Sequence, residues 1–322
     1  MRKRVERVSD IRVGISTCLL GQKVRYDGGH KHDRYLTDIL GAYFRFVPVC
    51  PELEVGMGVP RESVHLEGKT ESPRMIGTRS REDWTDRMNS YSRVRVKKRD
   101  LGSLRGYILK KDSPSCGMER VKLFGDKGMA ERKGVGLYAQ ALKEQYPLLP
   151  IEEEGRLNDA GLRENFIVRV FAYDRLRNLF DGRFARRDVV AFHANHKYLI
   201  LAHSSKHYTE MGRLVAAIAK HKPSDFRDMY CAAFMEALTV KTTIKKNVNV
   251  LQHIMGFLKD KLTSVEKADI NRVIDDYHHG LVPLVVPLTL VRHYVDKHQV
   301  VYIQEQVYLN PSPKELMLRN HV

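Results

Sequence analysis

Short apolar runs alternate with polar loops and helical patterns in the first half of the chain. Three runs have the length and composition of buried strands, at residues 13–18, 44–50 and 104–110. Apolar residues at helical spacing predict helices between them, at residues 34–43, 81–99 and 136–145. Strands that alternate with helices are typical of α/β proteins, so we predict a Rossmann-like parallel sheet for this half.

The second half has the hydrophobic period of helices throughout. Most of the predicted helices lie at residues 165–179, 188–220, 224–240, 243–262 and 288–298. Thr263-Ser-Val-Glu266 has the pattern of a capping box, which opens a further helix that stops at Gly280. We therefore predict an all-α domain at residues 160–322, after an α/β domain at residues 1–155.

Length and composition agree with two ordinary globular domains. The chain has 322 residues, of which 43% are hydrophobic and 29% charged. No apolar run reaches the roughly 18 residues of a membrane-spanning helix, so we expect no membrane association. The basic start of the chain lacks the features of a secretory signal, and we predict a cytoplasmic protein.

The net charge of +16 is shared by both halves of the chain. Residues 1–160 hold 31 basic and 23 acidic residues, and residues 161–322 hold 24 and 16, so each half carries +8. Such an excess attracts a polyanion, and nucleic acid is the commonest polyanion in the cytoplasm. A basic protein without such a partner is the alternative.

Three of the four cysteines follow predicted strands. Cys18 and Cys50 end the first two strands, and Cys116 lies just past the third. The carboxyl ends of parallel strands face the ligand crevice of a doubly wound sheet, so these residues could meet at one point. Four cysteines in a cytoplasmic chain argue against disulfides and leave metal binding, catalysis or burial. Cys231 lies in an apolar helical pattern and is interpreted as a core residue.

Three thiolates are an unusual number of metal ligands. Structural zinc prefers four, and the Cys-x-x-Cys pattern of redox pairs is absent. An iron–sulfur cubane held by three cysteines keeps one iron open, as Lewis-acid chemistry requires. Iron among thiolates and sulfides is soft and favours a thiocarbonyl sulfur over a carbonyl oxygen. Three separately buried cysteines are the alternative, which spacing alone leaves open.

Glu52 and Ser113 accompany two of these cysteines. Pro51 fixes φ between Cys50 and Glu52, and positions i and i+2 of an extended chain share a face about 7 Å apart. A proline at the second position of a turn brings Ser113 within about 7 Å of Cys116. An acid–base group and a hydroxyl would then lie beside one site. Alternatively, Glu52 begins a helix and Ser113 caps a turn.

Four motifs in the first half closely resemble the thiouracil desulfurase family. They are Ile15-Ser-Thr-Cys-Leu-Leu-Gly21, Val24-Arg-Tyr-Asp-Gly-Gly-His-Lys31, Val49-Cys-Pro-Glu52 and Asp112-Ser-Pro-Ser-Cys-Gly117. The resemblance covers roughly residues 10–150. It implies that Cys18, Cys50 and Cys116 ligate a 4Fe-4S cluster with one open iron. It also implies that Glu52 and Ser113 are the catalytic pair of a non-redox desulfuration.

The second half resembles a helical companion domain that is often fused to this catalytic domain. The segments that carry this resemblance are residues 192–198, 202–203, 247–257, 286–290 and 318–322. The two-domain arrangement is similar to bacterial tRNA 4-thiouridine desulfidases, which implies that tRNA is the substrate and the helical domain binds it. A desulfidase of free thiouracil or thiouridine nucleotides and a non-catalytic iron–sulfur RNA-binding sensor are the alternatives.

Basic residues in both halves are candidates for RNA contact. We predict such contacts at Arg25, Lys31, His193, Lys197, Lys245 and Lys246. His193, His196, His203 and His207 fall on one face of a predicted helix. These histidines could touch phosphates, be buried and hydrogen-bonded, or hold a metal ion.

Overall fold

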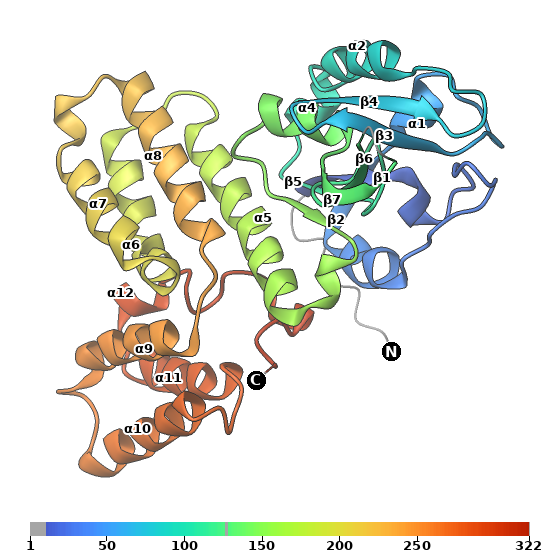
Figure 1. Ribbon diagram of the computed structural model, residues 1–322. Helices are drawn as coiled ribbons and strands as arrows, with labels where there is room; N and C mark the ends of the chain where they lie inside the picture. The colour runs from blue at the N-terminus through green and yellow to red at the C-terminus, as the bar shows by residue number, and fades with distance from the viewer. Residues whose placement is uncertain (1–10, 126–127, 322) are drawn as a thin grey trace. The chain divides into compact units, whose positions relative to one another are not determined.

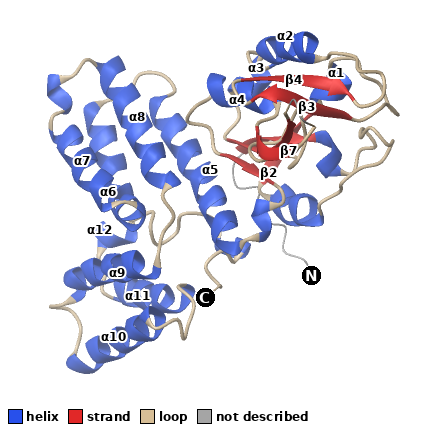
Figure 2. Ribbon diagram, in the orientation of Figure 1, coloured by secondary structure: helices blue, strands red, loops and turns tan. Residues whose placement is uncertain are grey.

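The chain divides into two units between Asn158 and Asp159. The structure is a computed structural model that describes residues 11–125 and 128–321. The first unit contains all the strands of the described residues, and the second is built from helices (Figure 1, Figure 2). The predicted fold classes, a parallel α/β sheet followed by an all-α region, are both confirmed for these residues.

The first sheet is parallel and carries the three predicted strands. Its strands are β1 (Ile11–Ser16), β2 (Phe44–Val49), β5 (Gly106–Leu109) and β8 (Ile151–Glu153), in the order β2-β1-β5-β8. Every neighbouring pair is parallel. The sequence did not predict β8, because its Ile-Glu-Glu composition is polar. Its two glutamates are nevertheless buried, and each carboxylate accepts hydrogen bonds from within the unit.

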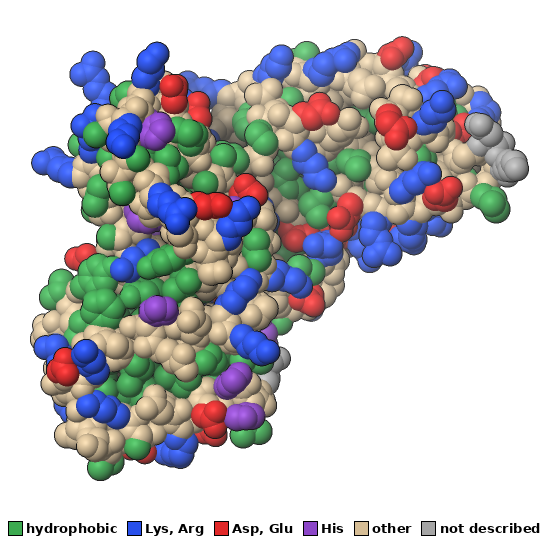
Figure 3. Space-filling view, turned by 60° about the vertical axis from the view of Figure 1, so that its left-hand side comes forward, with side chains coloured by type: hydrophobic (Ala, Val, Ile, Leu, Met, Phe, Trp, Pro, Cys, Tyr) green, Lys and Arg blue, Asp and Glu red, His purple; other side chains and the backbone are tan. Residues whose placement is uncertain are grey.

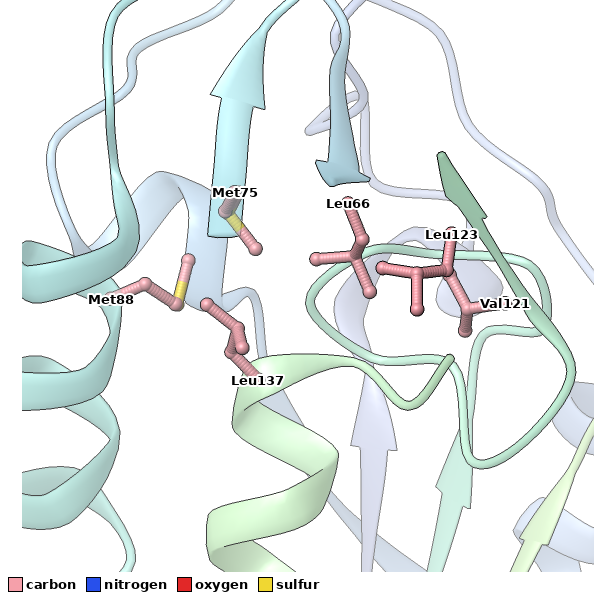
Figure 4. Packing of buried hydrophobic residues seen from close by; sticks show 6 residues of the cluster. All are labelled: Leu66, Met75, Met88, Val121, Leu123 and Leu137. Atoms are coloured by element: carbon pink, nitrogen blue, oxygen red, sulfur yellow. The ribbon is translucent and has the colours of Figure 1, made fainter. Parts of the chain in front are cut away.

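A second, mixed sheet was not predicted. It contains β3 (Val64–Lys69), β4 (Ser72–Gly77), β6 (Val121–Phe124) and β7 (Ala130–Gly134), in the order β4-β3-β6-β7. Its apolar face packs against α2 (Thr85–Arg95) and α4 (Leu137–Gln145). Figure 4 shows the contact, which is made by Leu66, Met75, Met88, Val121, Leu123 and Leu137. All six are at most 4% exposed, so this sheet closes a core of its own.

Short helical turns connect the strands of the first unit. They are η1 (Thr17–Leu20), η2 (Tyr35–Ile39), η3 (Leu40–Ala42), α1 (Pro51–Glu54), α3 (Arg99–Gly102) and η4 (Arg156–Asn158). The helix predicted at residues 81–99 begins later, because Arg81 has a φ of 63° and Asp83 bridges to Ile76 of β4. The Asp83 carboxylate then accepts the Thr85 N–H (3.0 Å), at the start of α2.

The second unit is a succession of helices. They are α5 (Ala160–Phe180), α6 (Arg186–His203), α7 (Ser205–Ala216), η5 (Ile218–Lys220), α8 (Pro223–Thr239), α9 (Ile244–Leu258), α10 (Ser264–His278), α11 (Val285–Lys297), α12 (Val301–Gln304) and η6 (Lys314–Leu316). The single helix predicted at residues 188–220 is wrong. Ser204 has extended backbone, and its side chain accepts the His207 N–H and starts α7. The capping box at Thr263 and Glu266 is confirmed.

None of the helices described is both long enough and apolar enough to cross a membrane.

Candidate functional site

A cavity of about 430 Å³ lies at the carboxyl ends of β1, β2 and β5. Its lining includes Cys18, Cys50, Cys116, Glu52 and Ser113. The structure therefore brings the three predicted metal ligands and the two predicted catalytic residues to one place. Its volume lies within the range of about 300–1,000 Å³ that is typical of small-molecule sites.

The strand ends and short turns place the first two thiols. Cys18 lies in η1, immediately after β1, where its carbonyl accepts the Lys31 N–H (2.9 Å). Gly21 ends this turn with a φ of 84°, a conformation that favours glycine. Cys50 follows β2 as the N-cap residue of α1, with Pro51 in the first helical position. The backbone is thus fixed on both sides of the cavity.

The loop that carries Cys116 is held by the N-terminus of α4. The N–H of Leu137 donates to the carbonyl of Pro114 (3.1 Å), and that of Tyr138 donates to the carbonyl of Ser115 (3.0 Å). A β-carbon on Gly136 would lie 2.5 Å from the Ser115 carbonyl, so this close approach requires glycine. The thiol is therefore presented by a loop whose carbonyls are already bonded.

Burial disfavours the thiolate form of all three cysteines. Burial raises the pKa of Cys18 to about 11, against the opposing effect of Lys110. Burial also raises the pKa values of Cys50 and Cys116. A charge on Cys50 raises the pKa of both other thiols further. Three thiolates here require a strong positive charge among them, which a metal centre provides.

Cysteine thiolates are the ligands that iron–sulfur clusters take. Among the residues described, no three His, Cys, Asp or Glu side chains are grouped so that they could hold one ion. In an iron–sulfur cubane each cysteine ligates a different iron, so the thiols need not converge on one atom. Cys18, Cys50 and Cys116 are unpaired and face one cavity, and their assignment as cluster ligands remains a prediction.

Two serines and an arginine surround the Glu52 carboxylate. Its Oε1 accepts the hydroxyl of Ser115 at 2.7 Å and lies 3.4 Å from the hydroxyl of Ser113. Its Oε2 forms an ion pair with Arg61. Sequence reasoning selected Ser113 and missed Ser115 and Arg61. The Ser-Pro-Ser repeat was a signal for Ser115, whereas Arg61 lies in a loop without periodicity.

The hydroxyls of Ser113 and Ser115 form one hydrogen-bond network with Glu52. Ser113 Oγ accepts the N–H groups of Ser115 and Cys116 (3.3 and 3.1 Å) and lies 3.0 Å from Ser115 Oγ. Either serine can donate the hydrogen bond between the two hydroxyls, and each hydroxyl also lies within hydrogen-bond distance of Glu52 Oε1. A continuous path of hydrogen bonds therefore leads from Ser113 through Ser115 to Glu52.

Basic and aromatic residues line the same cavity. Arg25, Lys31, Lys110 and Lys111 all belong to its wall. Lys110 is paired with Glu154 and Arg25 with Asp27 (3.6 Å), and the Arg25 guanidinium also lies 5.4 Å from the centre of the Tyr26 ring. Tyr26 also lines the cavity and is 43% exposed. The cavity thus offers cations and an aromatic face to a ligand.

The predicted RNA-contacting residues of the second unit have different surroundings. Burial lowers the pKa of His193 to about 4, and its Nδ1 lies 3.3 Å from the Tyr230 hydroxyl. Lys197 lies over the rings of Tyr198 and Tyr302. Lys246 donates to the carbonyls of His203 and Lys241, while Lys245 is exposed. Their contact with RNA remains a prediction, and His193 would carry no charge at neutral pH.

Basic side chains are dispersed over the surface in Figure 3. On this face, lysines and arginines are interspersed with carboxylates and uncharged side chains, and histidines gather over parts of the second unit. This agrees with the equal division of charge between the halves of the sequence.

Two family models match the chain. Residues 13–154 match the 2-thiouracil desulfurase family, so the predicted resemblance is confirmed for the first unit. Residues 197–313 match a family described as a protein of unknown function (DUF1722). The first match lies within the first unit, and the second match lies within the helical second unit.

Individual proteins are similar to about half of the chain. The uncharacterized protein YbgA of Escherichia coli (strain K12) is 27% identical over 158 residues, which cover 49% of this chain and 94% of that protein. A solved structure, the [4Fe-4S]-dependent thiouracil desulfidase TudS, is 26% identical. It covers 47% of this chain and 95% of its own, with a TM-score of 0.37.

Proposed function

We propose that this chain, whose residues 13–154 match the 2-thiouracil desulfurase family, is an iron–sulfur-dependent desulfidase. Its substrate in this proposal is 4-thiouridine in tRNA, which it converts to uridine. The observation that carries the proposal is the shared cavity of Cys18, Cys50, Cys116, Glu52 and Ser113.

The cofactor in this proposal is a 4Fe-4S cluster held by Cys18, Cys50 and Cys116. When bound, such a cluster supplies a Lewis-acidic iron with an open position that suits a thiocarbonyl sulfur. Glu52 and Ser113 line the same cavity, so a base held there would meet both side chains.

Glu52 is the proton acceptor in the proposed reaction. A thiocarbonyl and water become a carbonyl and hydrogen sulfide, and no electrons are exchanged. Glu52 Oε1 takes a proton from the attacking water, and the hydroxyls of Ser113 and Ser115 orient that oxygen and share the proton. Arg61, on Oε2, leaves Oε1 as the reactive oxygen.

Charge and exposure favour RNA as the carrier of the base. The net charge is +16, and Arg25, Lys31 and Lys111 belong to the cavity wall, where they could meet phosphates. Exposed Tyr26 offers a face on which a base could stack. Unstacking a base of the RNA costs a few kcal/mol, and RNA contacts of the second unit could offset this cost.

The test uses anaerobically reconstituted protein and tRNA that contains 4-thiouridine. We expect loss of the near-ultraviolet absorption of the thiobase together with release of sulfide. Glu52→Gln keeps the size of the side chain but cannot accept the proton, so its rate should fall at least about 100-fold. Cys18→Ser should lose iron, whereas Cys231→Ser, outside the cavity, should keep it.

Two results would count against the proposal. If cluster-loaded protein left the thiobase of tRNA intact but desulfurised free thiouracil or a thiouridine nucleotide, the substrate would be the small molecule. If it left every thiobase intact and Glu52→Gln changed no RNA-binding property, a non-catalytic iron–sulfur sensor would replace the enzyme.

A further inference from the structure

Arg61 joins three segments of the cavity wall. Its guanidinium forms an ion pair with Glu52 of α1, and its Nη1 donates to the carbonyls of Val24 (3.1 Å) and Gly58 (2.9 Å). Its backbone N–H donates to the carbonyl of Tyr26 (2.9 Å). The side chain is only 7% exposed and lines the cavity. Its position is therefore fixed by bonds on both sides of the guanidinium.

The orientation of the Glu52 carboxylate depends on the side chains that bind it. It lies in α1, a helix of four residues, and its side chain has several rotatable bonds. Arg61 binds Oε2, which turns Oε1 toward Ser115 and Ser113. The planar guanidinium presents donors in a fixed fork, so it can bind the carboxylate and the two carbonyls at once. The flexible ammonium of a lysine cannot reproduce this arrangement.

The charge of Arg61 is directed to Glu52 rather than to the neighbouring carboxylate. Glu62 accepts the N–H groups of Arg79 (2.7 Å) and Ser80 (3.0 Å). These bonds and the one from the Ser80 hydroxyl lower the pKa of Glu62 to about 2. They also engage both carboxylate oxygens of Glu62 with Arg79 and Ser80. The partly buried ion pair of Arg61 and Glu52 thus has no competing carboxylate among these contacts.

We propose that Arg61 is the positioning residue that orients Glu52 for the proton transfer. It acts through the carboxylate and does not touch the reacting base. The carbonyls of Val24 and Gly58 hold the guanidinium in place. This inference rests on the proposed desulfidase function, because it assigns Arg61 a part in that reaction.

The kinetic test compares Arg61→Ala and Arg61→Lys with wild type on 4-thiouracil and on thiolated tRNA. Misplacement of a catalytic group by about 1 Å can cost 100-fold, so Arg61→Ala should lower kcat about 100-fold while KM stays within about threefold. The kcat of Arg61→Lys should lie between those of wild type and Arg61→Ala. Guanidinium added to the assay should restore part of the kcat of Arg61→Ala, because it can take the place of the missing group beside Glu52. It would not restore activity to a variant that had merely lost its fold.

Two controls separate positioning from stability. Iron and sulfide content should equal that of wild type in both variants. Arg74→Ala removes an arginine of the same unit that is 62% exposed and paired with Asp83, and it should leave kcat unchanged. If Arg61→Ala lost activity only in proportion to lost iron, or kept wild-type kcat while Glu52→Gln was inactive, the inference would be overturned.

A crystal structure of Arg61→Ala gives a readout that does not depend on activity. We expect Glu52 Oε1 to leave hydrogen-bond distance of Ser115 Oγ. If the carboxylate stayed in place, Arg61 would not position it, whether or not the protein is a desulfidase. Failure of the proposed function would give a different result. The wild-type protein would release no sulfide, although the Glu52 carboxylate moved in the crystal structure of Arg61→Ala.

Discussion

Ser115 occupies the central position among the polar side chains of the cavity. It is 1% exposed and donates to Glu52 at 2.7 Å, whereas Ser113 is 3.4 Å from the same oxygen. A hydrogen bond weakens steeply as it lengthens, so most of the contact between the serines and Glu52 passes through Ser115. Ser115, the second serine of the Ser-Pro-Ser motif, is therefore the closer partner of the Glu52 carboxylate.

Replacement of Ser115 by alanine should impair catalysis. We expect kcat for 4-thiouracil to fall about 10- to 100-fold, because Glu52 loses its short donor and keeps only the longer contact with Ser113. Single-turnover sulfide release would measure the effect at equal iron content. Ser92→Ala is a matched control, since its hydroxyl is fully buried and has no partner among the residues described. A fully active Ser115→Ala beside an inactive Ser113→Ala would refute the path through Ser115.

Two histidines of helix α6, His196 and His203, are hydrogen-bonded within the second unit. His196 stacks on Phe192, and its Nε2 accepts from Arg175 (3.3 Å). His203 donates from Nδ1 to the carbonyl of Val240 (2.6 Å). Burial lowers the pKa of His196 to about 3 and that of His203 to about 4. These two imidazoles are neutral structural groups, which favours the second of the three interpretations for them.

The buried histidines of α6 predict a loss of stability in acid. A depressed pKa in the folded state means that the unfolded chain binds more protons, so stability is full above about pH 6.5 and falls toward pH 4. For fully buried His203 the loss amounts to about 3 kcal/mol over that range. Denaturant unfolding at pH 7.5, 6 and 5 should show it.

The variant His203→Gln tests the source of this pH dependence. Glutamine can still donate to the Val240 carbonyl but does not titrate. The slope of the unfolding free energy against pH should therefore fall by an amount that corresponds to the uptake of up to one proton on unfolding. His279→Gln, at an exposed position, is the control. An unchanged slope in His203→Gln would show that other groups cause the acid sensitivity.

The elements that the sequence predicted are those with an unmistakable apolar pattern. β1 and β5 are almost entirely buried. β5 lies within its predicted apolar run, and β1 overlaps its run of residues 13–18 but begins at Ile11. β7 was missed because four of its five residues, Ala130 to Lys133, are exposed, and three of these four are charged. Antiparallel pairing with β6 makes it a strand, and a pairing partner cannot be seen in the residues of the strand itself. The same reason explains Arg61, whose partners lie on other segments.

At the scale of the whole molecule, the basic excess is divided between two units. Each half of the sequence carries +8, and the cavity wall of the first unit contains Arg25, Lys31 and Lys111. A small neutral thiobase gains little from such a distribution, because it presents no phosphates. A tRNA presents phosphates along its length, so both units could contribute to its binding.

The dependence of the reaction on salt should therefore distinguish the two kinds of substrate. If tRNA makes about six phosphate contacts, its affinity should fall about a thousandfold between 50 and 200 mM salt. The KM for free 4-thiouracil should hardly change over the same range, and it serves as the control within one protein. A chain that ends at Asn158, the end of the first unit, should keep activity on the free base and lose it on tRNA. Equal salt dependence for both substrates, or full activity of the shortened chain on tRNA, would show that the second unit and the dispersed charge do not serve RNA binding.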